Sequence, residues 1–538
     1  MTEHPGDRLD SWKEIARYMD RGVRTVRRWE HDEGMPVHRH LHGTLGSVYA
    51  FKSELDAWRR AGSSAPRGAA PAGHPAIAVL PFANLSTDPE NAYLADGLSE
   101  EITADLAGVR ALRVVSRRSA ARISSTAKDA QAVAAQLGVR YLVEGSVRRA
   151  GDQLRITARL VDAPADETVW AGKYSGPVDD VFEMQERLAR TIVRALALQL
   201  TPEEDRRLAT RPIDHLRAYE CYLQARQDVW RWRKDSLDHA VRLLRAALDM
   251  IGDNATLYAA LGFAELQYRE AGIDTTDGPL HAAERCADRV SALEPSSAAS
   301  RQLRGWIDYA RGRIQDAVRQ LKAALDADPN NADTLLLLSN CYLISGRVHE
   351  ARPLLDRLLT IDPLTPLNRC MPAFADLLEG RASAALAPYR QMLAMDPANP
   401  MARLFYVWVL VLNARADEAG AVIREFPSQA ADSVPARLAA FLHRCAAGEG
   451  AAAAALISPQ VAAATAVSDV FPRFLAEGCA VAGMLDEAVT WLQRAVDRGF
   501  INHPFLAHHD PLLAPLRGHP RFAEILEQVR RRWEQFEA

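Results

Sequence analysis

The chain lacks the features that define several large classes of protein. Its 538 residues contain six cysteines, none in a CxxC pair, so we predict neither a disulfide framework nor a zinc site. No run of 18 apolar residues occurs; the best apolar stretch, 404–412, is too short to span a bilayer, and the N-terminus has no apolar signal core. We therefore predict a cytoplasmic protein without a cofactor.

The chain also has little excess of charge of either sign. The formal net charge is −4, which argues against a chain that coats nucleic acid or membrane along its whole length but leaves room for one local basic face. Apolar residues make up 48% and charged residues 25%, as in ordinary soluble proteins. At this length several domains are expected.

No catalytic constellation stands out. No nucleophile, phosphate-cradling glycine loop or metal-ligand spacing accompanies the acidic residues of segment 76–200. Acidic residues do gather in one segment, where they could bind a cation or act in acid–base chemistry, or simply complement a helix dipole: Asp88, Glu90, Asp96, Glu100 and Glu101. We predict a protein that is not an enzyme and keep an enzyme using this acidic loop as an alternative.

Three consecutive segments, 298–331, 332–365 and 366–399, share a period of 34 residues. Glycines recur in phase at Gly312, Gly346 and Gly380, each between two amphipathic stretches, and every unit closes on Asp-Pro. This spacing resembles the tetratricopeptide repeat, a pair of antiparallel helices that must stack on its neighbours to bury its apolar stripe.

The repeat pattern decays on both sides of these units. Further helix pairs are predicted at 216–250, 255–294, 400–426, 435–460 and 469–498, followed by a closing helix, so the solenoid covers 216–538 after a connector at 201–215. The 255–294 unit carries an insertion, "GIDTTDGPL", between its helices. We expect a specific contact there.

If the first helix of each unit lines the concave face, as in the family, a partly aromatic groove results. It would suit an apolar or mixed peptide of a protein partner. The alternative is that several of these side chains pack against neighbouring helices. The residues are Gln302, Trp306, Tyr309, Leu336, Asn340, Phe374 and Trp408.

Residues 1–60 predict a helix-turn-helix, two strands around a glycine-bounded turn, and another helix. The stretch "SWKEIARYMDRGVRTVRRWE" followed by "GMPVHR" resembles the winged DNA-binding module of the MerR and excisionase group. Arginine forks can bind phosphate or guanine, whereas a solvated charged face is the alternative. The predicted DNA-binding residues are Arg24, Thr25, Arg27, Arg28 and Arg39.

A linker rich in Ala, Gly, Ser and Pro, 61–75, leads to an α/β sandwich at 76–200. The stretches "IAVLPFANLSTDPENAYLADGLSEEI", "YLVEGSVRR" and "LRITARLVDA" resemble the TolB N-terminal-like and FlgO-like domain. Chains with this layout are sometimes labelled adenylate cyclases, but no segment here resembles a cyclase domain with paired metal-binding aspartates.

The predicted fold class is thus multidomain and mostly helical: a small winged helix-turn-helix, an α/β sandwich domain, and an all-α tetratricopeptide solenoid. We predict a DNA-binding transcriptional regulator whose solenoid binds a protein. A scaffold or adaptor that does not bind DNA is the alternative. No membrane partner is expected, and homo-oligomerisation is left open.

Overall fold

The computed structural model describes residues 8–9, 11–19, 26, 36–40, 47–52, 55, 74–86, 92–123, 129–209, 212–229, 233–426, 432–468 and 470–538. The chain forms two compact units, Met1–Ala70 and Pro71–Ala538, which divide inside the predicted linker. Within the described ranges, no helix combines the length and the apolar character that a membrane crossing requires.

The first unit combines a short helix with a small antiparallel sheet. Helix α1 (Trp12–Tyr18) begins at Ser11, whose side chain accepts a hydrogen bond from the backbone N–H of Glu14. Strand β3 (Ser47–Phe51) lies between β1 (Arg8–Leu9) and β2 (His38–His40). The expected strands in 36–51 are confirmed, since β2 and β3 pair in antiparallel fashion.

A small apolar core holds this unit together. Ile15 of α1, Val26 and Leu55 are fully buried and cluster with Ala50 of β3. Val26, in the segment of the predicted second helix, shares this core with Ile15 of the first. The remainder of the predicted second helix lies outside the described residues.

The second unit begins with a mixed sheet in the order β6–β4–β7–β8–β9, and β5 also pairs with β7. The first strands pair in parallel, whereas β7, β8 and β9 form an antiparallel meander. The turn between β7 and β8 contains Gly151 at a φ of 57°, a backbone conformation that favours glycine. The strands are β4 (Ala76–Val79), β5 (Ala83–Asn84), β6 (Arg113–Val114), β7 (Tyr141–Ala150), β8 (Gln153–Asp162) and β9 (Glu167–Pro177).

Helices pack on both faces of this sheet. Helices α4 (Ala92–Ala107) and α7 (Val181–Ala195) enclose the larger core with residues such as Val143 and Ile156. Helix α6 (Ala130–Leu137) packs on the other face, near the start of β7. The predicted α/β sandwich is therefore present, with the short helix α5 (Arg117–Ala121) after β6.

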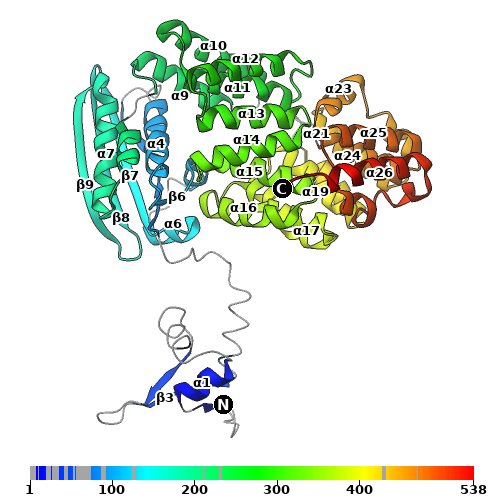
Figure 1. Ribbon diagram of the computed structural model, residues 1–538, viewed down its shortest axis with the longest axis horizontal. Helices are drawn as coiled ribbons and strands as arrows, with labels where there is room; N and C mark the ends of the chain where they lie inside the picture. Colours follow the sequence, from blue (N-terminus) through cyan, green and yellow to red (C-terminus); the bar gives the residue numbers. More distant parts are fainter. Residues whose placement is uncertain are drawn as a thin grey trace. The chain divides into compact units, whose positions relative to one another are not determined.

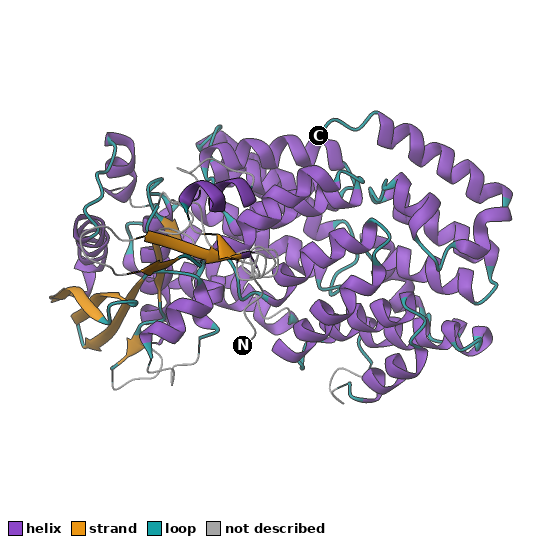
Figure 2. Ribbon diagram, turned by 90° about the horizontal axis from the view of Figure 1, so that it is seen from below, coloured by secondary structure: helices purple, strands orange, loops and turns teal. Residues whose placement is uncertain are grey.

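Helices then stack in pairs to the C-terminus (Figures 1 and 2). Helix α8 (Pro202–Ala209) is the connector, capped by a reciprocal pair in which Thr201 and Glu204 bond each other's backbone N–H. The helices after it are α9 (Leu216–Val229), α10 (Lys234–Ile251), α11 (Ala255–Glu270), α12 (Gly278–Leu293), α13 (Ala298–Ala310), α14 (Ile314–Ala327), α15 (Ala332–Ile344), α16 (Val348–Ile361), α17 (Pro366–Leu378), α18 (Leu386–Met395), α19 (Pro400–Leu412), α20 (Ala416–Arg424), α21 (Val434–Ala446), α22 (Gly450–Ala454), α23 (Pro459–Val467), α24 (Phe471–Val481), α25 (Leu485–Asp497) and α26 (Pro520–Glu534).

The 34-residue period is visible directly in the backbone. Gly312, Gly346 and Gly380 lie between the two helices of their units with φ values of 74°, 70° and 86°. Asp328 and Asp362 cap the C-terminal ends of α14 and α16, each just before a proline. Each predicted repeat is therefore one helical hairpin.

Most of the cysteines are buried in the helical half of the chain. Cys286, Cys341, Cys370, Cys445 and Cys479 are buried free thiols, and Cys221 is half-buried. Burial raises the pKa of the Cys370 thiol to about 12, which leaves it an unreactive thiol at neutral pH.

Candidate functional site

The acidic residues of α4 tie the α/β domain to the first helix of the solenoid. Glu100 forms an ion pair with Arg226 of α9, and Asp96 accepts a hydrogen bond from the side chain of Gln227 at 3.2 Å. Tyr93 donates to Glu220 of α9 at 2.6 Å. Asp96 and Glu100 thus contact α9, whereas Asp88 and Glu90 of the same predicted cluster lie outside the described residues.

Among the described residues of this cluster, Glu101 has the shifted pKa. Burial raises its pKa to about 7, and the nearby charges of Asp105 and Glu100 act in the same direction against the opposing effect of Arg226. Burial also raises the pKa of Asp105 to about 6. Among the described residues, no group of three His, Cys, Asp or Glu side chains could hold a metal ion.

A second contact joins the α/β domain to the middle of the solenoid. Asp362, which is fully buried, accepts hydrogen bonds from the hydroxyl groups of Ser116 at 2.7 Å and Ser119 at 2.5 Å. Arg118 of α5 bonds Asp333 at 2.5 Å and lies 3.4 Å from Asp362. The closing aspartate of one repeat is thus the acceptor for the preceding domain.

The predicted aromatic groove is filled by the chain itself at Phe374 and Trp408. The guanidinium of Arg473, on α24, lies 4.6 Å from the ring centre of Trp408 and 5.7 Å from that of Phe374. Trp408 is 1% exposed, and its indole N–H donates to Glu477 at 2.6 Å. These two positions belong to a buried cluster, as the packing alternative foresaw, and Trp408 is not accessible to a peptide.

Arg473 itself is a buried cation held between carboxyl groups. Its Nε atom lies 3.4 Å from Glu477, which is fully buried, and Asp510 is 2% exposed. Burial raises the pKa of Glu477 and of Asp510, and the charge of Asp510 raises that of Glu477 further. Sequence reasoning missed this cluster, although an Arg and a Glu four residues apart in an otherwise apolar helix was a usable signal.

The remaining predicted groove residues lie on α13 and α15. Tyr309 is buried and accepts a hydrogen bond at 2.7 Å from the side-chain amide of Asn340. The side chain of Gln302 donates to Asn331 at 3.0 Å. Trp306 and Leu336 are half-buried and pack against the core. The indole N–H of Trp306 is buried without a hydrogen-bond partner among the described residues.

The C-terminal segment, residues 497–538, lies along the turns of the three regular repeats. A Cβ atom on Gly312 would meet the carbonyl oxygen of Asp497 at 2.7 Å, and one on Gly346 would meet Trp533 at 2.9 Å. Arg347 donates to the carbonyl oxygen of Trp533 at 2.6 Å. The end of the chain reaches α14, where Lys322 donates to the main-chain carboxylate of Ala538.

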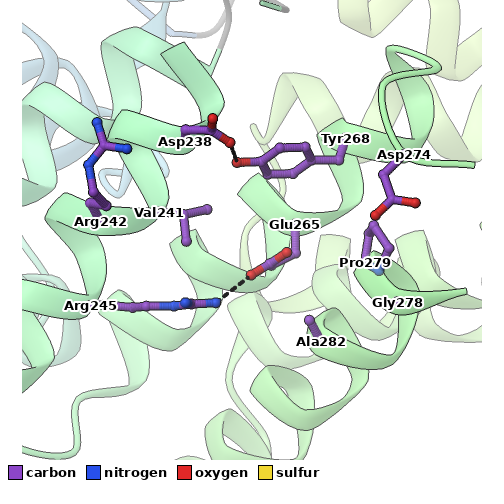
Figure 3. Close-up of a pocket in the computed structure, with 10 residues that line it drawn as sticks. All are labelled: Asp238, Val241, Arg242, Arg245, Glu265, Tyr268, Asp274, Gly278, Pro279 and Ala282. Atoms are coloured by element: carbon purple, nitrogen blue, oxygen red, sulfur yellow. Dashed lines mark hydrogen bonds and ion pairs between the residues drawn. The ribbon is translucent and has the colours of Figure 1, made fainter. Parts of the chain in front are cut away.

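An open groove is present at the predicted insertion (Figure 3). It lies over α11, between α10 and the start of α12, and encloses about 450 Å³. It is lined by Asp238, Val241, Arg242, Arg245, Glu265, Tyr268, Asp274, Gly278, Pro279 and Ala282. Asp274, Gly278 and Pro279 come from the insertion, so this part of the sequence does shape a cavity.

The groove carries charges of both signs. Arg245 pairs with Glu265 at 3.1 Å, and the hydroxyl of Tyr268 donates to Asp238 at 2.7 Å (Figure 3). Burial raises the pKa of Glu265 despite the nearby arginine, whereas hydrogen bonds from Lys234 and Tyr268 lower the pKa of Asp238.

Of the predicted DNA contacts, only Arg39, in β2, belongs to a described strand. Arg24, Thr25, Arg27 and Arg28 lie outside the described residues. Their role stays a prediction.

Comparison with known proteins supports two of the three predicted parts. Residues 308–367 and 376–445 match the family model for the tetratricopeptide repeat, and residues 70–169 match the model for the TolB amino-terminal domain. A curated relative, "Putative adenylate cyclase 3" of Rhizobium meliloti (strain 1021), is 38% identical over 192 residues, which are 36% of this chain and 33% of the relative. The match therefore spans about a third of that relative's length.

Solved structures show local likenesses. A thermophilic tetratricopeptide repeat protein of Thermus thermophilus is 22% identical with a TM-score of 0.30, over 35% of this chain and 98% of that one. TolB from Acinetobacter baumannii is 20% identical with a TM-score of 0.18, over 24% and 29% of the two chains. It is the family models that identify a TolB amino-terminal domain followed by tetratricopeptide repeats.

Proposed function

We propose that the protein is a cytoplasmic scaffold whose tetratricopeptide solenoid binds a segment of another protein at the groove between α10 and α12. The open cavity of about 450 Å³ at the inserted segment carries this proposal. The aromatic positions further along the solenoid are filled by Arg473 and its neighbours, so the groove near α10 is the better-supported docking place.

The lining indicates the chemistry of the partner. Arg242 and Arg245 stand on one wall, and Asp274 comes from the insertion on the other, as the close-up shows (Figure 3). A segment that presents an acidic and a basic side chain in turn would satisfy both walls. Such complementarity gives specificity more than raw affinity.

Charge reversal at one wall tests the proposal. The variant Arg242→Glu should lose proteins that co-purify with the wild-type full-length chain in its own host, measured by quantitative affinity enrichment. The matched control is Arg319→Glu on α14, an arginine whose side chain is 69% exposed and which pairs locally with Asp316. Equal enrichment by the two variants would contradict the proposed docking place.

We further propose that the chain performs no catalytic step. Asp96 and Glu100 are engaged with α9 and α5, which supports a packing role for the acidic segment. The name of the Rhizobium relative makes cyclic AMP formation from ATP the reaction to assay with the purified full chain. Turnover that is lost in the Asp96→Asn variant would overturn this part of the proposal.

A second candidate function is DNA binding by the first unit. It is favoured by the capped helix α1 and the paired strands β2 and β3, which agree with the predicted order of a winged module. Arg27→Ala/Arg28→Ala should weaken binding of the full chain to duplex DNA. Affinity that is insensitive to both the substitutions and the salt concentration would refute it, because phosphate contacts release counterions.

A further inference from the structure

The antiparallel part of the sheet in the α/β domain has two very different faces. One face packs under α4 and α7 through residues such as Val143, Ile156 and Tyr174. From the start of β8 to Leu160 the burial alternates, with Leu154, Ile156, Ala158 and Leu160 buried and the residues between them exposed. The second face of β7, β8 and β9 therefore points to solvent over most of their length.

Cations concentrate on this second face. The strand register sets out three rows: Arg148, Arg155 and Ser175; then Ser146, Thr157 and Lys173; then Glu144, Arg159 and Ala171. Four of these nine side chains are basic, and Glu144 alone is acidic. Glu144 is already paired with Arg159, whose side chain is 57% exposed. Arg148, Arg155 and Lys173 remain as an exposed excess of positive charge.

This arrangement has a cost for folding. Arg148 and Arg155 are directly opposite each other on neighbouring strands, and like charges in that position are destabilising. Lysine on an edge strand such as β9 protects against edge-to-edge association, which accounts for Lys173. It does not account for the two arginines, because β7 and β8 are interior strands. Local conflicts of this kind are expected where a surface serves a ligand.

The face is shaped for an extended acidic chain. Small and hydroxyl side chains, Ser146, Thr157 and Ala171, stand between the cations. Arg148 and Arg155 are exposed, and the guanidinium of Arg155 also donates to the hydroxyl of Ser175 at 3.3 Å. Rows two residues apart along a strand are separated by about 6.6 Å, which is also the repeat of alternate side chains in an extended peptide.

Nucleic acid fits this face less well. Single strands are usually held by stacking of bases on aromatic side chains, and the aromatic residues of these strands, Tyr141, Trp170 and Tyr174, pack on the other face. We propose that the exposed face of β7, β8 and β9 binds an acidic segment of a protein partner. Figure 1 shows β8 and β9 at the edge of the unit, on the side of α4 away from the repeats, where a partner could reach them.

The test uses the full chain and a fluorescent peptide of about twelve residues in which glutamate alternates with serine. Binding is followed by fluorescence anisotropy at about 150 mM salt, beside an oligothymidylate probe that carries a similar number of charges. The variant Arg148→Gln/Arg155→Gln should weaken peptide binding about tenfold, and Arg148→Lys/Arg155→Lys should retain most of it. The control is Arg530→Gln/Arg531→Gln on α26, which removes two arginines that are 46% and 70% exposed.

Hydrogen exchange gives a readout that a change in stability alone would not imitate. The peptide should protect amides of β8 and β9 in the wild type and leave those of α26 unchanged. The proposal is overturned if the two glutamine variants bind the peptide equally well. It is also overturned if the oligothymidylate binds more tightly than the peptide and responds to the same substitutions, since the face would then be a nucleic-acid site.

Discussion

Replacing Gly312 by alanine adds one methyl group where the C-terminal segment crosses the first regular repeat. The φ of 74° disfavours any residue with a Cβ atom by about 1–2 kcal/mol. The new methyl group would also lie 2.7 Å from the carbonyl oxygen of Asp497 and 3.1 Å from the Cα atom of Arg498. These are backbone atoms, so relief requires the segment to move, and such overpacking costs about 1–3 kcal/mol more.

Gly483 supplies a matched control, because it occupies the corresponding turn between α24 and α25. Its φ of 77° imposes the same backbone penalty, but no atom of the described residues lies within 4 Å of a Cβ placed there. The difference between Gly312→Ala and Gly483→Ala therefore isolates the contact with the C-terminal segment. We expect about 1–3 kcal/mol, a factor of about 5 to 150 in the local opening equilibrium.

Native-state hydrogen exchange measures this opening directly. The amide of Ile501 donates to the carbonyl oxygen of Ile344 at 3.0 Å, so it reports on the attachment of the C-terminal segment to the repeats. Exchange at Ile501 should accelerate strongly in Gly312→Ala and little in Gly483→Ala. Equal acceleration in both variants would refute a tight contact at the repeat turns.

Three further predictions concern the buried polar groups. Trp408→Phe removes the hydrogen-bond donor to Glu477 and should destabilise the protein by about 1–3 kcal/mol more than Trp306→Phe does. The indole N–H of Trp306 has no partner to lose among the described residues. Equal melting temperatures of the two variants would contradict this prediction. In the folded state the pKa of Glu101 is about 7, against 4.5 in an unperturbed chain, so the free energy of unfolding should fall as the pH rises between these values. Calorimetry of Glu101→Gln should show a weaker dependence of stability on pH in this range. An unchanged dependence would assign the effect to another group. Asp362→Ala removes the acceptor of Ser116 and Ser119, so it should weaken the contact between the α/β domain and α16 and raise hydrogen exchange in α5. The control Asp396→Ala, at the same repeat position, loses only its bond to Asn399 and should leave exchange in α5 unchanged. Similar exchange in both variants would show that Asp362 does not attach the α/β domain.

Local signals in the sequence predicted most of the helical architecture. The in-phase glycines fix where each hairpin turns, and the capping residues Ser11 and Thr201 mark where α1 and α8 begin. These features depend on residues within a few positions of one another, so a single sequence reveals them. The family models then confirmed the repeats and the TolB-like domain.

Contacts between distant segments could not be predicted in the same way. Arg473 lies 65 residues beyond Trp408 in the chain. Its spacing of four residues from Glu477 indicates an ion pair on one helix but not which distant rings that pair contacts. Only the fold shows that the solenoid brings the two together. At Trp408 the predicted groove is for this reason not an open surface. The insertion in the 255–294 unit was expected to make a specific contact; its residues line an open groove, and the contact itself stays a prediction.

The α/β domain holds the solenoid at two separate places, α9 through Glu220 and the end of α16 through Asp362. A repeat array without other contacts can stretch and twist, and it can gain or lose repeat units. Between the contacts at α9 and at the end of α16 the number of repeats is fixed, because one more unit of 34 residues would carry Asp362 away from Ser116 and Ser119. Duplication or loss of repeats is therefore constrained between 216 and 365.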